Sequence, residues 1–414
     1  MPEALTYPQF RNYWAGLLVA VTGYQMLVLF SLGWLITQEL SGDTRSLGYM
    51  STAVAGPAIL LTLFGGVFAD KLNPKHLLFA TQSSTGMVVL AVGLLVALDK
   101  IHQWHVLVAA FIIGSVQAFD NPTRQSIFPR LVSRDALYNA VALNSSVWTG
   151  TRIFGPLAAG IIIGRTDTYV AIFVTAAGFF TMALVARSLR LSTVRRAHGG
   201  VLREMAAGFG FLRRHSLFLT LIGMAFFNGM FGMSYIFLMP VFADDVLDVG
   251  PEKLGLLMGA AGTGALLGIV LAANARRFPH KGWLLLGGAA AHGACLVLFA
   301  LVSDAGHYRL SMVTLFAADL FVSVHLMMVM TTLQTLVPDD FRGRVMGFYT
   351  ITWSMIPLGG LQASQIAHHI SPPIAVAIGG LAVAALAMLV GVTNRRVRDI
   401  GLHTGTTDRA PTRP

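Results

Sequence analysis

Long apolar stretches recur along the whole chain, each about as long as a helix that crosses a bilayer. Such a helix needs roughly 20 mostly apolar residues to cross a hydrocarbon core of about 30 Å. The pattern therefore predicts an all-α membrane protein with twelve transmembrane helices, which we number as spans 1 to 12. They cover residues 13–37, 46–69, 76–98, 103–120, 136–163, 168–190, 216–243, 251–274, 281–303, 308–330, 343–370 and 373–393.

Composition supports a membrane environment. Of the 414 residues, 55% are hydrophobic and only 12% are charged, and the mean hydropathy is +0.67. Soluble domains carry about 25% charged residues because their surface faces water. The composition therefore excludes an ordinary soluble domain.

The basic residues predict the orientation of the chain. If both termini are cytoplasmic, the inner segments hold 23 of the 29 lysines and arginines, the outer loops hold five, and Arg152 lies inside a span. Such an excess on the cytoplasmic side is the rule for membrane proteins. It explains the net charge of +10 without nucleic acid as a partner. We predict a multi-pass protein of the inner (plasma) membrane.

Repeated features indicate two similar halves, offset by about 205 residues. Pro74 aligns with Pro279, each in a short loop after the second span of its half. We predict two pseudo-symmetric six-helix bundles, and transporters built from such repeats bind substrate near the bilayer midplane. The linker between the bundles is either an amphipathic helix at the cytoplasmic interface or a basic tether. The predicted segments are 1–190 and 216–393 for the bundles, 191–215 for the linker and 394–414 for a basic cytoplasmic tail.

The loop between spans 2 and 3 carries the most specific motif. Gly66, Asp70, Lys71 and Lys75 match the signature loop of the major facilitator superfamily, which this segment resembles; asparagine and proline replace two other positions of that pattern. The resemblance implies the twelve-helix major facilitator fold and a gate, in which Asp70 faces the N-terminus of span 11. Lys71 or Lys75 would pair with Asp120 at the end of span 4. An ordinary basic cytoplasmic loop is the alternative.

Span 5 contains Gly155, Pro156 and Gly160, which resemble the Gly-Pro motif in span 5 of antiporters in this superfamily. The resemblance implies close packing on span 8, where three glycines offer a small-residue face. It favours efflux and leaves uptake as the minority interpretation. The span 8 glycines are Gly262, Gly264 and Gly268.

The segment after span 4 resembles a narrower branch of the superfamily, that of enterobactin exporters and macrolide-efflux-type permeases. The resemblance is sharpest at residues 120–125, 129–132 and 139–144. Drug exporters of the superfamily usually have an arginine inside span 4. Here Gln117 is the only strongly polar residue of that span before Asp120.

Three ionisable residues lie inside predicted spans, where such groups are costly and are functional candidates. They are Arg152 in span 5, and Asp319 and His325 in span 10. We expect Asp319 to carry the coupling proton and Arg152 to bind a polar or anionic group of the substrate. A structural ion pair between them is the alternative.

Polar residues in cavity-lining spans are weaker candidates for the substrate site: Gln25 in span 1, Asn144 in span 5 and Asn228 in span 7. His292 in span 9 is expected to be a packed or interfacial histidine. No glycine-rich phosphate loop with lysine occurs, so we expect no direct use of ATP and no enzymatic activity. The single cysteine, Cys295, provides no disulfide framework, and we expect no metal and no cofactor.

The sequence thus predicts a monomeric proton-coupled exporter, in contact with membrane lipids, of a small amphipathic molecule such as a siderophore or a drug. A translocator of lipid or lysophospholipid with the same fold is the alternative, and a membrane sensor is a third. A sideways opening between spans 5 and 8, or between spans 2 and 11, would favour lipid.

Overall fold

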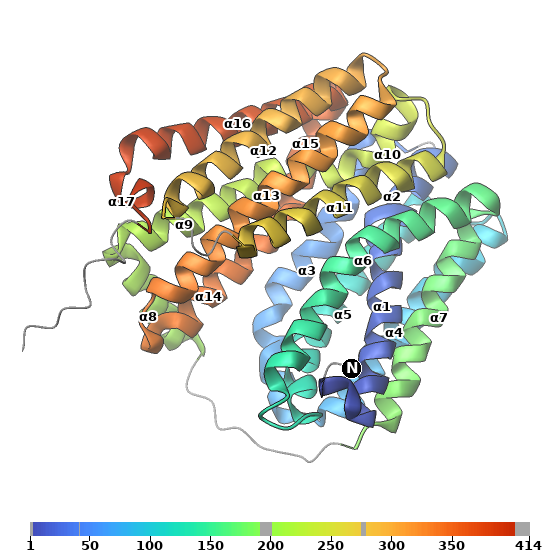
Figure 1. The fold of residues 1–414 in the computed structure, drawn as a ribbon. Coiled ribbons are helices and arrows are strands. Elements are labelled where there is room, and N and C mark those ends of the chain that lie inside the picture. Colours follow the sequence, from blue (N-terminus) through green and yellow to red (C-terminus); the bar gives the residue numbers. More distant parts are fainter. Residues whose placement is uncertain (1–2, 41, 191–200, 275–278, 402–414) are drawn as a thin grey trace, which may run out of the picture. The chain divides into compact units, whose positions relative to one another are not determined.

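The computed structural model describes residues 3–40, 42–190, 201–274 and 279–401, without the side chains of residues 62–71, 138, 201–207 and 340. This part of the chain is helical and contains no β-strand, which confirms the predicted fold class (Figure 1). Each predicted span coincides with one helix or with a run of consecutive helical segments. The single-helix spans are α3 (Thr44–Lys71), α4 (Pro74–Ala97), α5 (Gln103–Ile127), α6 (Leu137–Arg165), α7 (Thr168–Ser188), α11 (Pro251–Asn274), α12 (Lys281–Asp304), α13 (Tyr308–Leu336) and α16 (Pro372–Thr393).

Spans 1, 7 and 11 are interrupted helices. Span 1 consists of α1 (Pro8–Met26), a π turn at Leu27–Ser31, α2 (Leu32–Trp34) and a second π turn at Leu35–Glu39. Span 7 has the same character: its segments are α9 (Ser216–Phe227), a π turn at Asn228–Gly232, a 3-10 helix at Ser234–Leu238, α10 (Met239–Val241) and a π turn at Phe242–Val246. Span 11 divides at Ser354 into α14 (Asp339–Trp353) and α15 (Ile356–His369).

Four shorter helices of the described chain lie outside the spans: a 3-10 helix at Glu3–Thr6, a 3-10 helix at Phe128–Arg130 after α5, α8 (Val201–Arg214) in the linker, and α17 (Arg395–Arg398) after span 12. The helix predicted for the linker is therefore present over 201–214, while residues 191–200 lie outside the description. Within α8, Leu212 is buried and Phe209 is exposed.

Ten helical segments of the described chain are long and apolar enough to cross a membrane. The exterior of the helices agrees with this, since large apolar side chains such as Leu60, Met388 and Val392 are exposed. In water such a surface would be a liability, whereas hydrocarbon tails solvate it. The chain is a multi-pass membrane protein.

The described chain forms two compact units, which differ from the two halves predicted above. The first contains residues up to 197 together with 235–262 and 360–372, and the second contains 198–234, 263–359 and the remainder. The ends of spans 7, 8 and 11 that are predicted to face outward therefore pack with the first six spans.

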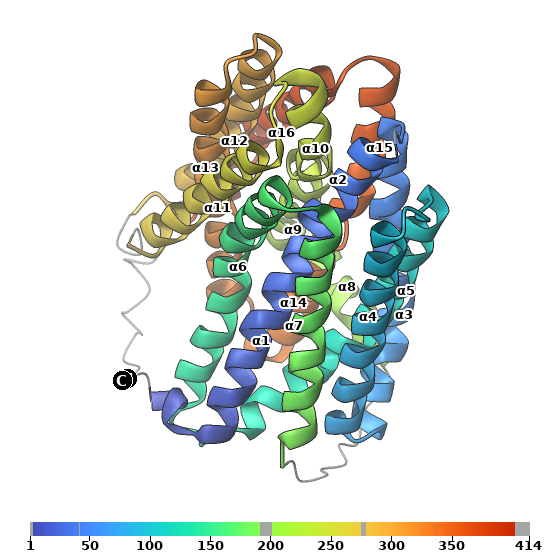
Figure 2. The same ribbon diagram turned by 90° about the vertical axis from the view of Figure 1, so that its right-hand side faces the viewer.

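Within the first unit, α1 packs between α6 and α7, and α5 packs against α3 and α4 (Figure 2). Gly114 of α5 lies against the backbone of Val54 in α3, so closely that a methyl group would overlap the carbonyl. In the second unit α12 packs along α13, and Gly293 of α12 meets the backbone of Gly380 in α16 in the same way. Small residues allow such close approach of membrane helices.

Candidate functional site

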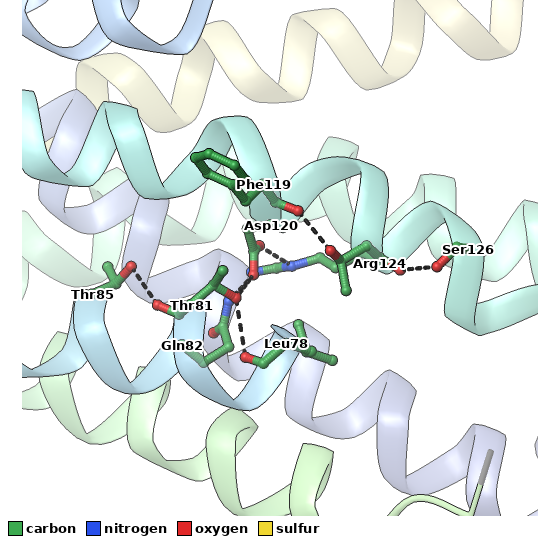
Figure 3. Close-up of polar contacts among 9 residues, drawn as sticks. Leu78, Thr81, Gln82, Thr85, Phe119, Asp120, Arg124 and Ser126 are labelled. Carbon is green, nitrogen blue, oxygen red and sulfur yellow. Dashed lines mark hydrogen bonds and ion pairs between the residues drawn. The ribbon is translucent and has the colours of Figure 1, made fainter. Parts of the chain in front are cut away.

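A buried ion pair lies near the C-terminal end of α5, at the end of span 4 (Figure 3). The guanidinium of Arg124 contacts the Oδ2 atom of Asp120, and both side chains are almost fully buried. The other carboxylate oxygen, Oδ1, accepts hydrogen bonds from Thr81 and Gln82 of α4, each at 2.7 Å. The charges are thus paired and hydrogen-bonded, which buried charges require.

This pair exists because α5 is longer than predicted. The sequence places the end of span 4 at residue 120, but the helix continues through Pro122 to Ile127. Residues four apart lie on one face of a helix, so Asp120 and Arg124 meet. Arg124 therefore belongs to the helix and not to a solvated cytoplasmic loop, and its four-residue spacing from Asp120 was the signal that could have identified it.

Several polar atoms around the pair have no hydrogen-bond partner. They belong to buried side chains from three spans: the hydroxyl of Tyr13 in α1, the Oε1 atom of Gln82 in α4, and Nη1 of Arg124 and Oε1 of Gln117 in α5. Most buried polar atoms in proteins are paired, so unpaired ones suggest a site that accommodates water, a proton or a ligand.

The predicted gate is only partly described. Gly66, Asp70 and Lys71 lie at the end of α3, where the backbone is helical and the side chains are outside the description. Lys75 is the second residue of α4, and its backbone N–H donates to the side chain of Asn73 at 3.0 Å. The described partners of Asp120 are Arg124, Thr81 and Gln82, and the pairing of Asp120 with Lys71 or Lys75 stays a prediction.

The span 5 motif lies where α6 meets two other spans. A Cβ atom added to Gly155 would be 2.7 Å from the Cβ atom of Gln25 in α1. Gly160 lies against the backbone of α11, where a Cβ would be 2.9 Å from the Cα atom of Gly255. Pro156 lies between these two contacts, and its carbonyl oxygen is close to Gly255 as well.

Of the three span 8 glycines that were predicted to contact span 5, one does so. Gly262 faces Ile153 of α6, as expected. Gly264 and Gly268 instead lie against the backbone carbonyls of Phe316 and Leu320 in α13. The reason is helical geometry: positions two and six residues beyond Gly262 point away from the face that α6 occupies.

Two ion pairs join segments at the predicted outer side of the first unit. The Oδ1 atom of Asp43 lies 2.6 Å from Nδ1 of His368 at the end of α15, and Asp43 also pairs with Arg45 at 2.9 Å. Arg165, at the end of α6, pairs with Glu252 of α11 at 3.3 Å. Burial raises the pKa of Asp43, but the bonds from Arg45 and the charge of His368 outweigh it, so the pKa is lowered overall.

The ionisable residues predicted in the spans lie in different compact units. Arg152 is half-buried in α6 of the first unit, and Asp319 is buried in α13 of the second. His325, also in α13, is fully buried, and its Nδ1 atom lies 2.9 Å from the carbonyl oxygen of Leu285 in α12. The roles of these three residues in coupling and substrate binding stay predictions.

The weaker polar candidates have varied surroundings. Gln25 is buried against Gly155, and Asn144 is half-buried in α6. Asn228 is buried at the start of a π turn, with both atoms of its amide unpaired. No group of three metal-ligating side chains was found among the described residues.

A groove of about 440 Å³ runs along α3 on the first unit. Its lining is almost entirely apolar and comes from spans 2, 4 and 11: Tyr49, Thr52, Ala53, Gly56, Pro57, Leu60, Leu61, Phe111 and Leu361. The opposite face of α3 is buried, since Leu47, Ser51 and Val54 point into the unit. The groove therefore lies on the outer surface of α3.

The interface between spans 5 and 8 is closed over the part of it in the first unit. The backbones of α6 and α11 meet at Gly160 and Gly255, which leaves no space for an acyl chain. Of the two sideways openings considered from the sequence, the one beside spans 2 and 11 is where this groove lies among the described residues.

Comparison with known proteins gives consistent results. The family model described as "Transmembrane secretion effector" matches residues 3–404. The chain is 24% identical to the enterobactin exporter EntS of Escherichia coli (strain SMS-3-5 / SECEC), over 95% of this chain and 94% of that protein. It is 23% identical to the staphyloferrin A transporter of Staphylococcus aureus, over 85% and 88% of the two chains.

Solved structures support the fold. A bacterial homolog of the human lysosomal transporter Spinster, in an inward-facing and occupied conformation, matches with a TM-score of 0.73 and 16% identity, over 95% of this chain and 98% of that chain. The nucleoside transporter NupG matches with a TM-score of 0.71 and 13% identity, over 93% and 98%.

Proposed function

Because the chain belongs to the transmembrane secretion effector family of the major facilitator superfamily, we propose that it is a proton-coupled exporter of a small amphipathic molecule. The substrate class is siderophore-like, and the protein acts as a monomer in the inner membrane with both termini in the cytoplasm. The observation that carries this proposal is the match, along 85% to 95% of the chain, to two proteins named as siderophore transporters. Transporters of this superfamily are not enzymes, and they move small molecules across a membrane.

Alternating access supplies the mechanism. In this fold class the two halves rock around a midplane site, so contacts on one side form while those on the other side break. The contacts at the predicted outer side are the pairs Asp43–His368 and Arg165–Glu252 and the packing of Gly160 on Gly255. Release of substrate to the outside requires these contacts to separate.

The coupling proton has two candidate acceptors. Asp319 is the candidate expected from the sequence, and Asp120 is added because it is buried against Arg124. Protonation of Asp120 would remove its charge and leave the guanidinium of Arg124 uncompensated. An anionic group of the substrate could then replace the carboxylate, which would link proton binding to substrate binding.

The groove beside α3 favours the alternative, a translocator of lipid or lysophospholipid. From Tyr49 to Leu61 the helix rises about 18 Å at 1.5 Å per residue, which is about half the thickness of a hydrocarbon core. One acyl chain of a single leaflet fits this length. The lining is apolar and Leu60 at its edge is 71% exposed.

Transport in proteoliposomes tests both functions. Counterflow is measured with enterobactin-type siderophores, macrolides and lysophospholipids, with and without an imposed pH gradient. Export of a siderophore or macrolide, accelerated by a gradient that drives protons inward across the native membrane, is the expected result. Movement of lysophospholipid alone, without effect of the gradient, would establish the alternative.

The same assay separates the two proton acceptors. The Asp319→Asn and Asp120→Asn variants each keep the shape of the side chain and remove the titratable group. The variant that retains counterflow and loses acceleration by the gradient identifies the coupling residue. Unchanged acceleration in both would remove both residues from that role.

A further inference from the structure

Three helices of the second unit meet where span 7 begins and span 12 ends, on the predicted inner side (Figure 1). One residue separates α8 from α9, and α17 follows α16. Two hydrogen bonds join these segments: Nη1 of Arg396 donates to the hydroxyl of Ser216 at 3.1 Å, and Nδ2 of Asn394 donates to the hydroxyl of Thr220 at 3.3 Å. The start of α9 and the end of span 12 are therefore side by side.

Arginines from two distant segments gather at this point. Arg213 and Arg214 are the last two residues of α8, and Arg396 belongs to α17. Consecutive Cα atoms are about 3.8 Å apart, so the Cα atoms of Arg214 and Ser216 are separated by at most about 7.6 Å. Because the guanidinium of Arg396 bonds to Ser216, it lies near the end of α8 although 180 residues separate it from Ser216 in the sequence. We call these three arginines the basic corner.

The charges of the basic corner are not compensated by described carboxylates. The nearby Asp399 pairs with Arg395 at 3.2 Å. Within the part of the chain whose side chains are described, none of the salt bridges includes Arg213, Arg214 or Arg396. All three side chains are exposed. The corner thus presents a positive charge that an anion can neutralise.

Aromatic packing fixes the chain at the basic corner. The buried ring of Phe211 in α8 stacks on Phe218 of α9 and on Phe341 of α14, with centroids 5.7 Å and 4.5 Å apart. These contacts hold the last turn of α8 against two other helices. The backbone that carries Arg213 and Arg214 is therefore in place before a ligand binds, which lowers the entropy cost of binding.

Apolar side chains lie directly beside the charges. Nη1 of Arg398 donates to the carbonyl oxygens of Gly391 and Val392, at 2.6 Å and 3.0 Å, so a further guanidinium lies at the C-terminus of α16. The side chains of Val392 and Leu389 are 76% and 58% exposed, and Leu219 in the first turn of α9 is 44% exposed. Such side chains face acyl chains in a bilayer. Positive charge thus adjoins apolar surface, which matches the phosphate and acyl chains of a phospholipid.

We propose that the basic corner binds the phosphate group of an anionic phospholipid in the predicted inner leaflet. Arg214 and Arg396 contact the phosphate oxygens, since a guanidinium can donate two parallel hydrogen bonds to such a group. The acyl chains lie along Leu219 and Val392. Basic residues directly beside a transmembrane helix are typical of sites for anionic lipids. The bound lipid joins the linker helix α8 to spans 7 and 12.

Lipid binding by the purified protein in detergent tests the site. Native mass spectrometry counts the bound phospholipids while phosphatidylglycerol, or phosphatidylcholine with the same acyl chains, is added. We expect the wild type to prefer phosphatidylglycerol, and the double variant Arg214→Gln with Arg396→Gln to lose this preference. Each arginine removed should weaken the binding of phosphatidylglycerol about fivefold, which is the effect of one basic residue near an anionic membrane surface.

The matched control removes two arginines at the end of α7 in the first unit. Arg187 and Arg190 are exposed and are predicted to be cytoplasmic. The double variant Arg187→Gln with Arg190→Gln therefore has the same net charge as the test variant, and we expect it to keep the wild-type preference. An equal loss in both double variants would reduce the effect to a general attraction by the inner surface and overturn the site. Unchanged binding in the test variant would overturn it as well.

Inorganic phosphate distinguishes a lipid from a free anion, because it carries the same charged group without acyl chains. We expect it not to displace phosphatidylglycerol at equal concentration, and displacement would show that the corner is a site for free phosphate. Should the test variant unfold at a lower temperature than the control, Arg213→Gln replaces it, since Arg213 is exposed. No transported substrate enters these measurements, so their outcome is independent of the proposed function.

Discussion

The carboxylate of Asp43 contacts the imidazole of His368 at 2.6 Å and so joins the segment after span 1 to the last turn of α15. Both side chains are about one-third exposed, and Arg45 pairs with the same carboxylate. The pair carries two full charges only while His368 is protonated.

Removal of the Asp43 carboxylate should weaken the contacts between segments at the predicted outer side of the first unit. We expect Asp43→Asn to increase outside access to a cysteine placed at Ser51, a fully buried position of α3, in a background with Cys295 replaced by serine. Labelling by a membrane-impermeant maleimide measures the access. A cysteine at Thr166, which is exposed, serves as the control and should react equally in both proteins.

The pH dependence of this contact follows from the lowered pKa of Asp43. A carboxylate whose folded-state pKa is lowered contributes stability above its unfolded pKa of about 3.9, and this contribution is lost as the pH falls through the folded value. We expect access to the Ser51 cysteine to rise on acidification in that range. In Asp43→Asn this acid-induced increase should be absent; an equal increase in both proteins would contradict the assignment.

Substitution of Gly160 should destabilise the protein, while substitution of Gly150 in the same helix should not. In Gly160→Ala the new methyl group overlaps the backbone of Pro251 and Gly255, and overpacking of this kind costs about 1–3 kcal/mol. At Gly150 a Cβ meets nothing within 4 Å, so Gly150→Ala should gain about 0.5–1 kcal/mol from helix propensity. Opposite shifts of the unfolding midpoint in detergent are the expected result, and shifts of the same sign would contradict it.

Replacing one residue of the buried pair in α5 should lower the stability of the protein far more than replacing both residues. Asp120→Asn leaves the charge of Arg124 buried and uncompensated, which costs about 3–5 kcal/mol. The double variant with Arg124→Gln removes both charges and should recover much of this loss. Unfolding in detergent measures all three proteins, and a double variant no more stable than the single one would exclude the buried charge as the cause.

The groove beside α3 should hold an acyl chain. Gly56 lines it and a Cβ there meets nothing within 4 Å, so Gly56→Leu places a side chain in the groove without disturbing the helix. Gly223 of α9 is exposed and equally free of neighbours, and Gly223→Leu is the matched control. Native mass spectrometry should find less co-purified lipid only in Gly56→Leu; equal retention in all three proteins would show that the groove binds no specific lipid.

The fold was predictable because a single physical requirement dominates it. Each span must form the hydrogen bonds of its backbone internally and present apolar side chains to lipid. The result is a recognisable apolar pattern of about 20 residues. The division of span 11 at Ser354 and the π turns of spans 1 and 7 were not predictable. They depend on packing against neighbouring helices. The hydrophobic periodicity of a single helix carries no information about that packing.

The ion pair of Asp120 and Arg124 was missed for a local reason. The predicted span ends at residue 120, two residues before Pro122, and proline usually ends a helix or breaks its hydrogen bonds. In α5 the helix continues past the proline and buries the arginine. The partners of Gly264 and Gly268 were wrong for a related reason, since the face of a helix that meets a given neighbour depends on tertiary structure.

The π turns of spans 1 and 7 have a mechanical consequence. A π turn contains one residue more than an α turn, and such a turn occurs at Leu27–Ser31 and again at Asn228–Gly232. If the extra residue passes along the helix by one turn, the segment it crosses rotates by about 100° around its own axis. In each of these two helices, movement of the π turn would therefore rotate the side chains of one segment about the helix axis. The rest of the helix would keep its hydrogen bonds, and its ends would keep their positions.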